Sequence, residues 1–577
     1  MTKAPSKVRY LVVAAAFVMA ALLYLDRYCV SIAAVYIQQD LGLTDQQVGT
    51  MLGAFFLTYA LGQVPSGWLA DRYGSRLMLT LYILAWSLLT GLTGVAGVFA
   101  ALLSLRYALG FAQAGAYPTA ASIVSKWMPL AARGRASSVI AVGGRVGGFL
   151  AMFATGYVLI WLTPLSTPTE LASADILDGS QLCIELAERS DPATPEQLVR
   201  VRYLATFTST TQELVSDYAN LHAEDISMSP PLPGETVAAL AEALNTIIQR
   251  QGFFTEAELQ GISLEKEATR LLHRPASELT PQQSQRLNRL VLEGLHRKSI
   301  KKLYVAGWRP MMFLYGSLGL FVAGLVWWTS RDVPAQHPWC NEEEVALIQG
   351  ARPVGGGEHK KLGGVPIGPL LRSYSMWLCC ALQFFTNVGW VFLLTWAPRY
   401  FQSVHHVSVE QLALMVSIPS LFGWAGTITG GGATDYLVHR IGPRWGRGLP
   451  MSVSRFAAMG AYLACLASPS PWFAVAMFSI VAFATDFGTP SVWAYVQDAG
   501  GRHVGSILGW GNMWGNIGAT VAPSLLIWIV GETQRWDLAF LICAMAFLLA
   551  GVAAAGINAT IPIVRDDEAT EAESGAL

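Results

Sequence analysis

GWLADRYGSR, residues 67–76, places one aspartate and two arginines between two apolar segments. No charged residue occurs from Val48 to Val64 or from Leu77 to Leu105. An α-helix that crosses a bilayer core of about 30 Å needs about 20 mostly apolar residues. The charged stretch is therefore predicted to be a short turn at a membrane surface, between two helices that span the bilayer.

The composition of the whole chain favours the same interpretation. Charged residues make up 13% of the 577 residues, about half of the roughly 25% found in soluble proteins, and the mean hydropathy is +0.41. The net charge of −1 argues against a nucleic-acid-binding protein. The seven cysteines show no spacing typical of a zinc site or a disulfide framework. We expect an integral membrane protein that needs a lipid bilayer, with no metal, no cofactor and no nucleic acid partner.

Twelve segments are apolar enough to be candidate membrane helices. They are residues 10–36, 47–68, 77–96, 98–124, 136–162, 306–329, 375–400, 410–431, 450–467, 472–496, 504–530 and 536–558. The predicted fold is thus an all-α membrane protein with two bundles of six helices.

The positions of lysine and arginine predict the orientation, because cytoplasmic loops are rich in basic residues. The loops after the second, fourth, eighth and tenth segments are basic; they contain Arg72, Arg76, Lys126, Arg133, Arg135, Arg440, Arg444, Arg447 and Arg502. The loops QQDLGLTDQQ and SPSP, after the first and ninth segments, contain none. The protein is therefore predicted to lie in the plasma (inner) membrane, with both termini in the cytoplasm.

Two long polar segments interrupt this pattern and define the expected domains. These are an N-terminal bundle (1–162), an insert (163–305), a sixth helix (306–330), a central cytoplasmic loop (331–374) that contains the flexible stretch GGGEHKKLGG, a C-terminal bundle (375–560) and an acidic cytoplasmic tail (561–577).

The insert, residues 163–305, has 19 acidic and 13 basic residues and is expected to be a mostly helical extracytoplasmic domain. Thr280 is a candidate helix cap, because Pro281 suits a first helical position. His222, His273 and His296 stand alone in the sequence and are interpreted as solvated surface residues. The insert is a candidate binding surface for a partner in the cell envelope, a shield for the outer mouth, or a spacer.

A glycine and an aspartate recur at the same spacing in both halves of the chain. Gly67 precedes Asp71 by four residues, and Gly431 precedes Asp435 by four, each at the end of the second segment of its half. Two parallel six-helix halves are a known transporter architecture with a substrate site near the midplane. The repeat therefore predicts two structurally related bundles around one central site.

GWLADRYGSR resembles the loop between helices 2 and 3 of the major facilitator superfamily. Five further stretches resemble its anion:cation symporter family, which includes bacterial sugar-acid (hexuronate) permeases: YLDRYCVSIA (24–33), FLTYALGQVPSGWLADRYGSR (56–76), RYALGFAQAGAYPTAASIVSKWMP (106–129), GWRPMMFLYGSLGL (307–320) and GNMWGNIGATVAP (511–523). The resemblance covers about 1–160 and 306–560 and leaves out the insert. It implies a conformational latch formed by Gly67, Asp71, Arg72, Arg76 and Asp435; the alternative is that these residues only mark topology.

Ionisable residues inside membrane helices are costly and are functional candidates. The resemblance implies that Arg27 binds the substrate anion, that Asp26 takes a coupling proton, and that Arg106 is essential. Gln113, two helical turns after Arg106, occupies a position where the family usually has a glutamate, and a glutamine does not titrate. Asp26 alone then carries the proton, or the driving ion differs, or the protein is a facilitator.

Arg145, in VGGRVGG, is unusual because the family commonly has an uncharged polar residue near this position. It contacts either a second anionic group of the substrate or a carboxylate such as Asp26 or Asp486. Asp486 is a second candidate for protonation, or it pairs with a basic residue such as Arg455. Other polar and aromatic residues complete the candidate site: Tyr24, Tyr59, Gln63, Trp493, Asn512 and Asn516. By resemblance, Tyr24, Tyr59, Trp493 and Asn512 line the substrate cavity.

The predicted function is a secondary transporter of small organic anions, such as sugar acids or related carboxylates, that works by alternating access with proton or sodium coupling. The alternatives are transport of phosphate or another anion, uncoupled facilitation, and a membrane receptor that binds without transport. The sequence contains no nucleophile elbow, zinc motif or Walker loop, so an enzyme is not expected. We expect a monomer.

Overall fold

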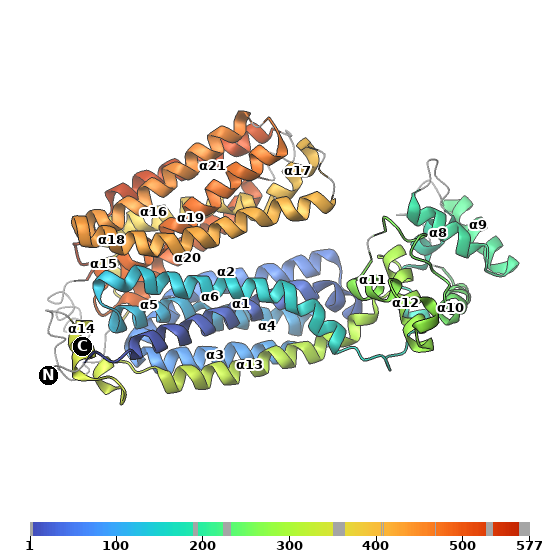
Figure 1. The fold of residues 1–577 in the computed structure, drawn as a ribbon, viewed down its shortest axis with the longest axis horizontal. Coiled ribbons are helices and arrows are strands. Elements are labelled where there is room, and N and C mark those ends of the chain that lie inside the picture. Colours follow the sequence, from blue (N-terminus) through green and yellow to red (C-terminus); the bar gives the residue numbers. More distant parts are fainter. Residues whose placement is uncertain are drawn as a thin grey trace. The chain divides into compact units, whose positions relative to one another are not determined.

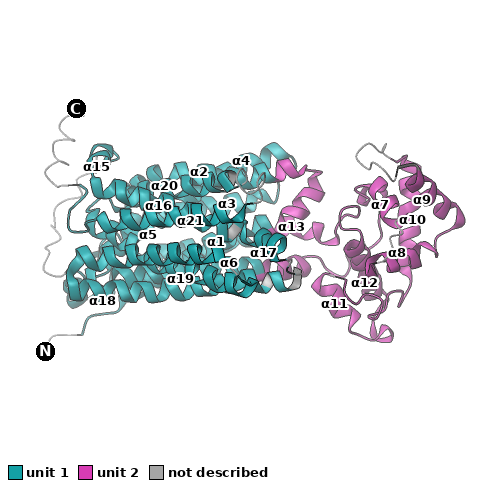
Figure 2. Ribbon diagram, turned by 90° about the horizontal axis from the view of Figure 1, so that it is seen from above, with its two compact units in different colours: residues 1–31, 49–152, 312–577 teal, residues 32–48, 153–311 magenta. Residues whose placement is uncertain are grey.

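A computed structural model describes the fold over residues 4–187, 194–222, 232–262, 264–349, 364–405, 407, 409–467, 469–526 and 535–564. Regular structure in these ranges is helical. The chain forms two compact units, one of residues 1–31, 49–152 and 312–577 and one of residues 32–48 and 153–311 (Figure 2). Most of the predicted stretch GGGEHKKLGG and of the acidic tail lies outside the described residues.

Seven helices form the N-terminal bundle (Figure 1). They are α1 (Val8–Leu41), α2 (Asp45–Tyr73), α3 (Ser75–Thr93), α4 (Phe99–Ala114), α5 (Ala116–Trp127), α6 (Arg133–Trp161) and α13 (Trp308–Thr329). The helices α4 and α5 follow each other through Gly115, which itself has helical angles (φ −79°, ψ −11°). Together they match the single predicted segment 98–124.

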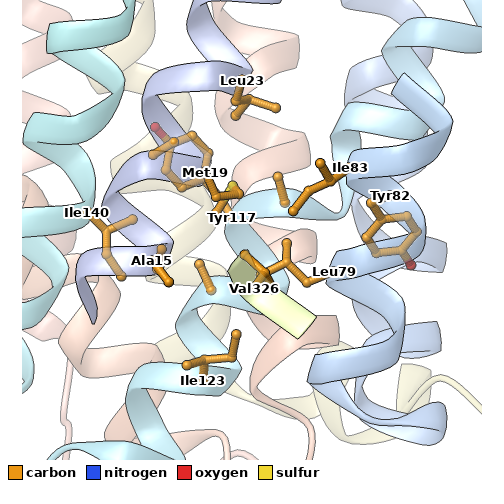
Figure 3. Packing of buried hydrophobic residues seen from close by; sticks show 14 of the residues in the cluster. Ala15, Met19, Leu23, Leu79, Tyr82, Ile83, Tyr117, Ile123, Ile140 and Val326 are labelled. Atoms are coloured by element: carbon orange, nitrogen blue, oxygen red, sulfur yellow. The ribbon is translucent and has the colours of Figure 1, made fainter. Parts of the chain in front are cut away.

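The core of this bundle is built from apolar side chains of all seven helices. Met19 and Leu23 of α1, Leu79 of α3, Ile140 of α6 and Val326 of α13 are at most 1% exposed and point toward one another (Figure 3). Apolar interiors of membrane proteins are held mainly by close packing, because lipid is as apolar as the side chains. This packing fixes the helices that carry the polar residues of the candidate site.

The C-terminal bundle contains α16 (Tyr374–Thr395), α17 (Ala397–His405), α18 (Val409–Ala464), α19 (Pro471–Ala499), α20 (Val504–Leu526) and α21 (Trp536–Gly556). The chain reverses within α18 at Gly442, which has φ +81°. Arg447 and Asp435 are twelve residues apart, about 18 Å along a straight helix, yet their side chains form an ion pair of 3.2 Å. The two arms of α18 correspond to the separate predicted segments 410–431 and 450–467.

Each of the twelve predicted segments overlaps one helix, two consecutive helices or one arm of α18. Nine helices in the described part of the chain are long and apolar enough to cross a membrane, and α18 counts once among them. An all-helical membrane fold is therefore confirmed, and the count of twelve spans stays a prediction.

The second unit contains the insert and has its own core. Its helices are α7 (Gly179–Ala187), α8 (Pro195–Leu204), α9 (Ser209–His222), α10 (Gly234–Gln249), α11 (Lys266–Leu272) and α12 (Pro281–Leu295). The predicted cap of α12 is confirmed. Thr280 Oγ1 accepts a hydrogen bond of 3.3 Å from the Gln283 N–H, and the Gln283 side chain accepts one of 3.0 Å from the Thr280 N–H.

His296 is buried in this core, so its interpretation as a solvated residue was wrong. Its Nδ1 lies 2.6 Å from Glu185 Oε2, and its Nε2 contacts the Tyr203 hydroxyl. Polar partners from α7 and α8 make this burial possible, since a buried polar group is tolerated when it is hydrogen-bonded. His273, in contrast, is exposed beside Glu256, as expected, and the side chain of His222 lies outside the described residues.

Acidification is expected to destabilise the insert through His296. Burial lowers the pKa of His296 below its ordinary 6.5, and Glu185 offsets only part of this effect. The folded state therefore prefers the neutral imidazole. The free energy of unfolding decreases as pH falls below about 6.5, by at most about 1.4 kcal/mol for each unit by which the pKa of His296 is lowered. The protection factor of the α12 amides in the full chain, which corrects the exchange rate for the intrinsic rate at each pH, is expected to be lower at pH 5.5 than at pH 7.5.

Two comparisons isolate this effect. Burial raises the pKa of Glu293 to about 6, so acidification stabilises the folded insert through this residue. The informative quantity is therefore the difference between wild type and His296→Gln. That variant is expected to lose the acid-dependent decrease in the protection factor, whereas the exposed His273→Gln control keeps it. Equal pH profiles for wild type and His296→Gln would contradict the assignment.

Candidate functional site

Arg27, in the middle of α1, lies among three aromatic rings. Its guanidinium carbon is 4.8 Å from the ring centre of Tyr24, 4.9 Å from that of Phe55 and 4.4 Å from that of Tyr59. Phe55 and Tyr59 are one turn apart on α2 and stack at 5.5 Å. Aromatic faces attract cations, more strongly when both groups are desolvated. The arginine charge is thus held inside the N-terminal bundle and away from lipid.

Gln113 contacts Arg27 directly. Arg27 Nε donates a hydrogen bond of 3.3 Å to Gln113 Oε1, and Gln113 Nε2 donates one of 3.3 Å to the Leu23 carbonyl. Among the described residues, no acceptor contacts the buried Arg27 Nη2. A neutral amide therefore orients the guanidinium and leaves its positive charge uncompensated.

Arg106 and Asp26 are buried without complete hydrogen bonding. Arg106 is 2% exposed and Asp26 is fully buried. Within the described ranges, neither Arg106 Nε and Nη1 nor the two Asp26 oxygens have a hydrogen-bond partner. The guanidinium carbon of Arg106 lies 5.2 Å from the Phe55 ring, so Arg27 and Arg106 share one aromatic neighbour. An unpartnered buried donor or acceptor is costly, which makes these groups candidates for a ligand or a proton.

Aromatic and amide side chains link this cluster to the C-terminal bundle. The Tyr117 ring lies 6.3 Å from Tyr24 and 5.0 Å from Trp493 of α19. Asn512 of α20 donates a hydrogen bond of 3.4 Å to Gln63 of α2. The predicted residues Tyr24, Tyr59, Gln63, Trp493 and Asn512 thus belong to one continuous region between the two bundles. Asn516 bonds instead to the Asn512 carbonyl, one turn earlier on its own helix.

Arg145 and Asp486 form an ion pair between the bundles. Arg145 Nη2 lies 2.6 Å from each carboxylate oxygen of Asp486. Arg455, the other partner considered for Asp486, donates to Thr386 Oγ1 and to the Thr485 carbonyl, both on its own side. Of the alternatives left open by the sequence, the structure shows the pairing of Arg145 with Asp486 in this conformation.

The two aspartates of the repeat each bind the first turn of a helix in the opposite bundle. Asp71 accepts hydrogen bonds from the Gly505 N–H (2.9 Å), the Ser506 N–H (2.8 Å) and the Ser506 hydroxyl (2.8 Å) of α20. A helix N-terminus has free N–H groups and a partial positive charge that favour a carboxylate. A Cβ added to Gly67 would lie 2.2 Å from the Gly505 carbonyl oxygen, so glycine is needed for this close approach.

Asp435 repeats the arrangement from the other half. Its carboxylate accepts hydrogen bonds from the Gly134 N–H (2.9 Å) and the Arg135 N–H (2.8 Å) at the start of α6. Gly431 lies against the same turn, since an added Cβ would be 2.7 Å from the Gly134 carbonyl oxygen. The structural equivalence suggested by the two Gly–Asp pairs extends to their hydrogen bonds.

The predicted arginines of the latch do not take part in these bonds. Arg72 packs on Trp68 and Tyr73, and Arg76 donates to the Trp327 carbonyl, within the N-terminal bundle. Their share in the latch stays a prediction that these contacts do not support.

Other charged residues join the bundles beside Asp435. Asp498 accepts from Arg133 Nη1 (2.8 Å) of the N-terminal bundle and from Arg447 Nε (2.9 Å) of its own bundle. Sequence reasoning used Arg133 and Arg447 only as topology markers and did not single out Asp498. Phe55 was also missed, although its spacing of four residues from Tyr59 places both on one helix face.

Comparisons with known proteins agree with this geometry. The family model of the Major Facilitator Superfamily matches residues 16–166 and 303–523. A probable sulfoacetate transporter of Cupriavidus necator is 22% identical over 97% of this chain and 96% of its own length. A probable galactarate/D-glucarate transporter of Escherichia coli is 23% identical over 94% of this chain and 93% of its own length. The fold is similar to that of a variant of the Escherichia coli fucose:proton symporter, with a TM-score of 0.52 and 11% identity over 93% of this chain and 97% of that one.

Proposed function

The chain belongs to the Major Facilitator Superfamily and is an integral membrane transporter, not an enzyme. On this premise, we propose that it moves small organic anions by alternating access. The substrates are sugar acids or related carboxylates, and the driving ion is a proton or sodium. Names of the relatives support this class, since they refer to sulfoacetate and to galactarate and D-glucarate. The site residues are Arg27, Arg106, Arg145, Tyr24, Tyr59, Trp493 and Asn512.

One observation carries the proposal: two buried guanidinium groups, Arg27 and Arg106, have nitrogens without partners in the described structure. Arginine presents a rigid set of donors that suits a carboxylate. The aromatic rings of Tyr24, Phe55 and Tyr59 hold the arginines but supply no negative charge. An anionic ligand is the group that satisfies both the charge and the hydrogen bonds.

Alternating access follows from the interactions between the bundles. Asp71 and Asp435 close the end that sequence predicts to be cytoplasmic, and the substrate residues lie between the bundles further along the helices. In Figure 1 the ribbons of the two bundles come together near α5 and α18 and diverge toward α17. A rocking motion of the bundles would break the hydrogen bonds of Asp71 and Asp435 in one half of the transport cycle and form them again in the other. We assign this conformation to a state closed on the cytoplasmic side.

Coupling is assigned to Asp26 and Asp486, because Gln113 does not titrate. The Gln113→Glu variant is expected to show a steeper dependence of uptake on pH than wild type. A glutamate at this position would form an ion pair with Arg27 at high pH and compete with the substrate, whereas protonation would release the arginine. Initial uptake rates between pH 5.5 and 8 measure the change. Gln402→Glu, at an exposed glutamine of α17, makes the same substitution outside the site and is expected to keep the wild-type profile. An unchanged pH profile in Gln113→Glu would count against this coupling scheme.

Uptake into proteoliposomes tests the proposal as a whole. A panel of radiolabelled sugar acids, presented with and without a proton or sodium gradient, is expected to show accumulation of at least one acid that depends on a gradient. Accumulation only down the substrate gradient would identify an uncoupled facilitator. Transport of phosphate but of no sugar acid would overturn the substrate class, and binding without flux would identify a receptor.

A further inference from the structure

The ion pair between Arg145 and Asp486 uses only part of the arginine. One nitrogen, Nη2, contacts both carboxylate oxygens at 2.6 Å, whereas an arginine in its strongest pairs donates from two nitrogens in parallel. No residue of the described chain accepts from Nε or Nη1. The side chain of Arg145 is 36% exposed, and that of Asp486 is 6% exposed. The carboxylate is covered, and the free edge of the guanidinium remains open.

The open edge of Arg145 faces the region of the substrate residues. Its guanidinium carbon lies 5.6 Å from the ring centre of Trp390 of α16. Tyr24 and Tyr117 lie against the preceding Gly144, and Tyr28 lies against Gly148, one turn later on α6. These rings come from α1, α5 and α16, on both sides of the interface. The exposure of Arg145 is therefore toward the space between the bundles.

Tyr24 lies beside Arg27 and beside the helix turn that carries Arg145. Arg27 lies over the Tyr24 ring at 4.8 Å, and a Cβ added to Gly144, the neighbour of Arg145, would lie 2.8 Å from Cε2 of the same ring. The two arginines therefore belong to one neighbourhood. Two arginines in one neighbourhood suit a small molecule with an acidic group at each end.

The balance of charge in the interior supports a ligand with two negative charges. Four arginines and two aspartates lie inside the described membrane helices of both bundles, away from their ends: Arg27, Arg106, Arg145, Arg455, Asp26 and Asp486. Even with both aspartates ionised, two positive charges remain. Uncompensated buried charge is unfavourable by several kcal/mol, and a dianion removes this excess.

We propose that Arg145 is a second anion subsite, that Asp486 occupies it in the ligand-free protein, and that the transporter selects small dianions whose distal acid group takes the place of Asp486. This inference rests on the proposed function and narrows its substrate class. Arg455 stays beside the displaced carboxylate, since it already interacts electrostatically with Asp486. The exchange replaces one ion pair with another, so that binding releases a contact between the bundles.

Binding of matched mono- and diacids to the purified protein in nanodiscs tests the inference. Galactarate and D-galactonate share a carbon chain and differ in one acid group. Wild type is expected to bind galactarate about 30-fold more tightly, which is the effect of about one charge-assisted hydrogen-bonded contact. Arg145→Gln is expected to reduce this preference to less than about threefold, because the affinity for galactarate falls about tenfold more than the affinity for D-galactonate.

A second variant changes affinity in the opposite direction and so excludes a folding defect. Asp486→Asn removes the internal competitor and is expected to raise the affinity for galactarate several-fold more than the affinity for D-galactonate. Arg309→Gln is the matched control, because Arg309 also pairs with an aspartate, Asp40, at 2.9 Å but lies outside the subsite. It is expected to keep the wild-type preference.

The outcomes separate this inference from the proposed function. Equal affinity of wild type for the two acids, or an equal loss of both in Arg145→Gln, would overturn the dianion subsite while organic-anion transport stands. Absence of binding and of transport for every organic acid would overturn both.

Discussion

Replacing Arg106 with alanine is expected to abolish uptake while the protein remains folded and in the membrane. The guanidinium is 2% exposed, and its Nε and Nη1 have no partner among the described residues, so its removal breaks no internal hydrogen bond of these two nitrogens. Truncating one member of a buried charge pair costs about 3 kcal/mol, or about 100-fold in affinity. The effect therefore appears when the anion binds, and the free protein is little affected.

Three further variants make this prediction specific. Arg106→Lys keeps the charge but has a single donor point, so we expect partial uptake. Arg27→Gln is expected to abolish uptake as well, because Arg27 lies beside the same Phe55 ring. Arg535→Ala removes an exposed arginine paired with Asp537 and is expected to transport normally. Wild-type uptake by Arg106→Ala would contradict the assignment of the anion site to this region.

Replacing Asp71 with alanine is expected to shift the protein toward conformations open at the predicted cytoplasmic end. The change removes three hydrogen bonds to the first turn of α20. A carboxylate that caps a helix contributes about 1–2 kcal/mol, and 2 kcal/mol changes the ratio of two conformations about 30-fold. We expect transport to fall about tenfold or more, because the cycle then spends little time in the state closed at this end.

Distance measurements between spin labels at Tyr73 and Arg502 report the shift directly. Both residues are exposed and lie on opposite bundles, two residues from Asp71 and from the start of α20. The mean distance is expected to increase in Asp71→Ala, to increase less in Asp71→Asn, which keeps one acceptor oxygen, and to stay unchanged in the control Arg72→Ala. Identical distance distributions in wild type and Asp71→Ala would show that this carboxylate does not hold the bundles together.

The helices and the two Gly–Asp pairs were predictable because they depend on local patterns. Apolar length decides which segments become membrane helices, and a glycine one turn before an aspartate marks a close contact wherever it recurs. Thr280 and Pro281 are a similar case, since a helix start is encoded within four residues. In each case the energy that fixes the structure comes from neighbours in sequence.

The partners of the buried charges were not predictable in this way. Arg145 and Asp486 are 341 residues apart, and either has several possible counterions until the bundles are packed. His296 was taken for a solvated residue because it stands alone in the sequence. The neighbouring helix α12 contains Arg286, Arg289 and Glu293, and its composition does not reveal which of its charged residues are buried. These three residues are at most 3% exposed. Arg286 pairs with Glu267 of α11, and Arg289 pairs with Glu293, one helical turn later.

The reciprocal contacts of Asp71 and Asp435 have a mechanical consequence. Each bundle supplies one carboxylate and receives one, so the bundles are fastened at two separate points. Once the ion pair between Arg145 and Asp486 is broken, two rigid bodies joined at these two points keep one rotational degree of freedom, about the line through both points. The opposite ends of the two bundles therefore separate by a small hinge rotation, and the axis of this rotation passes through the two contacts.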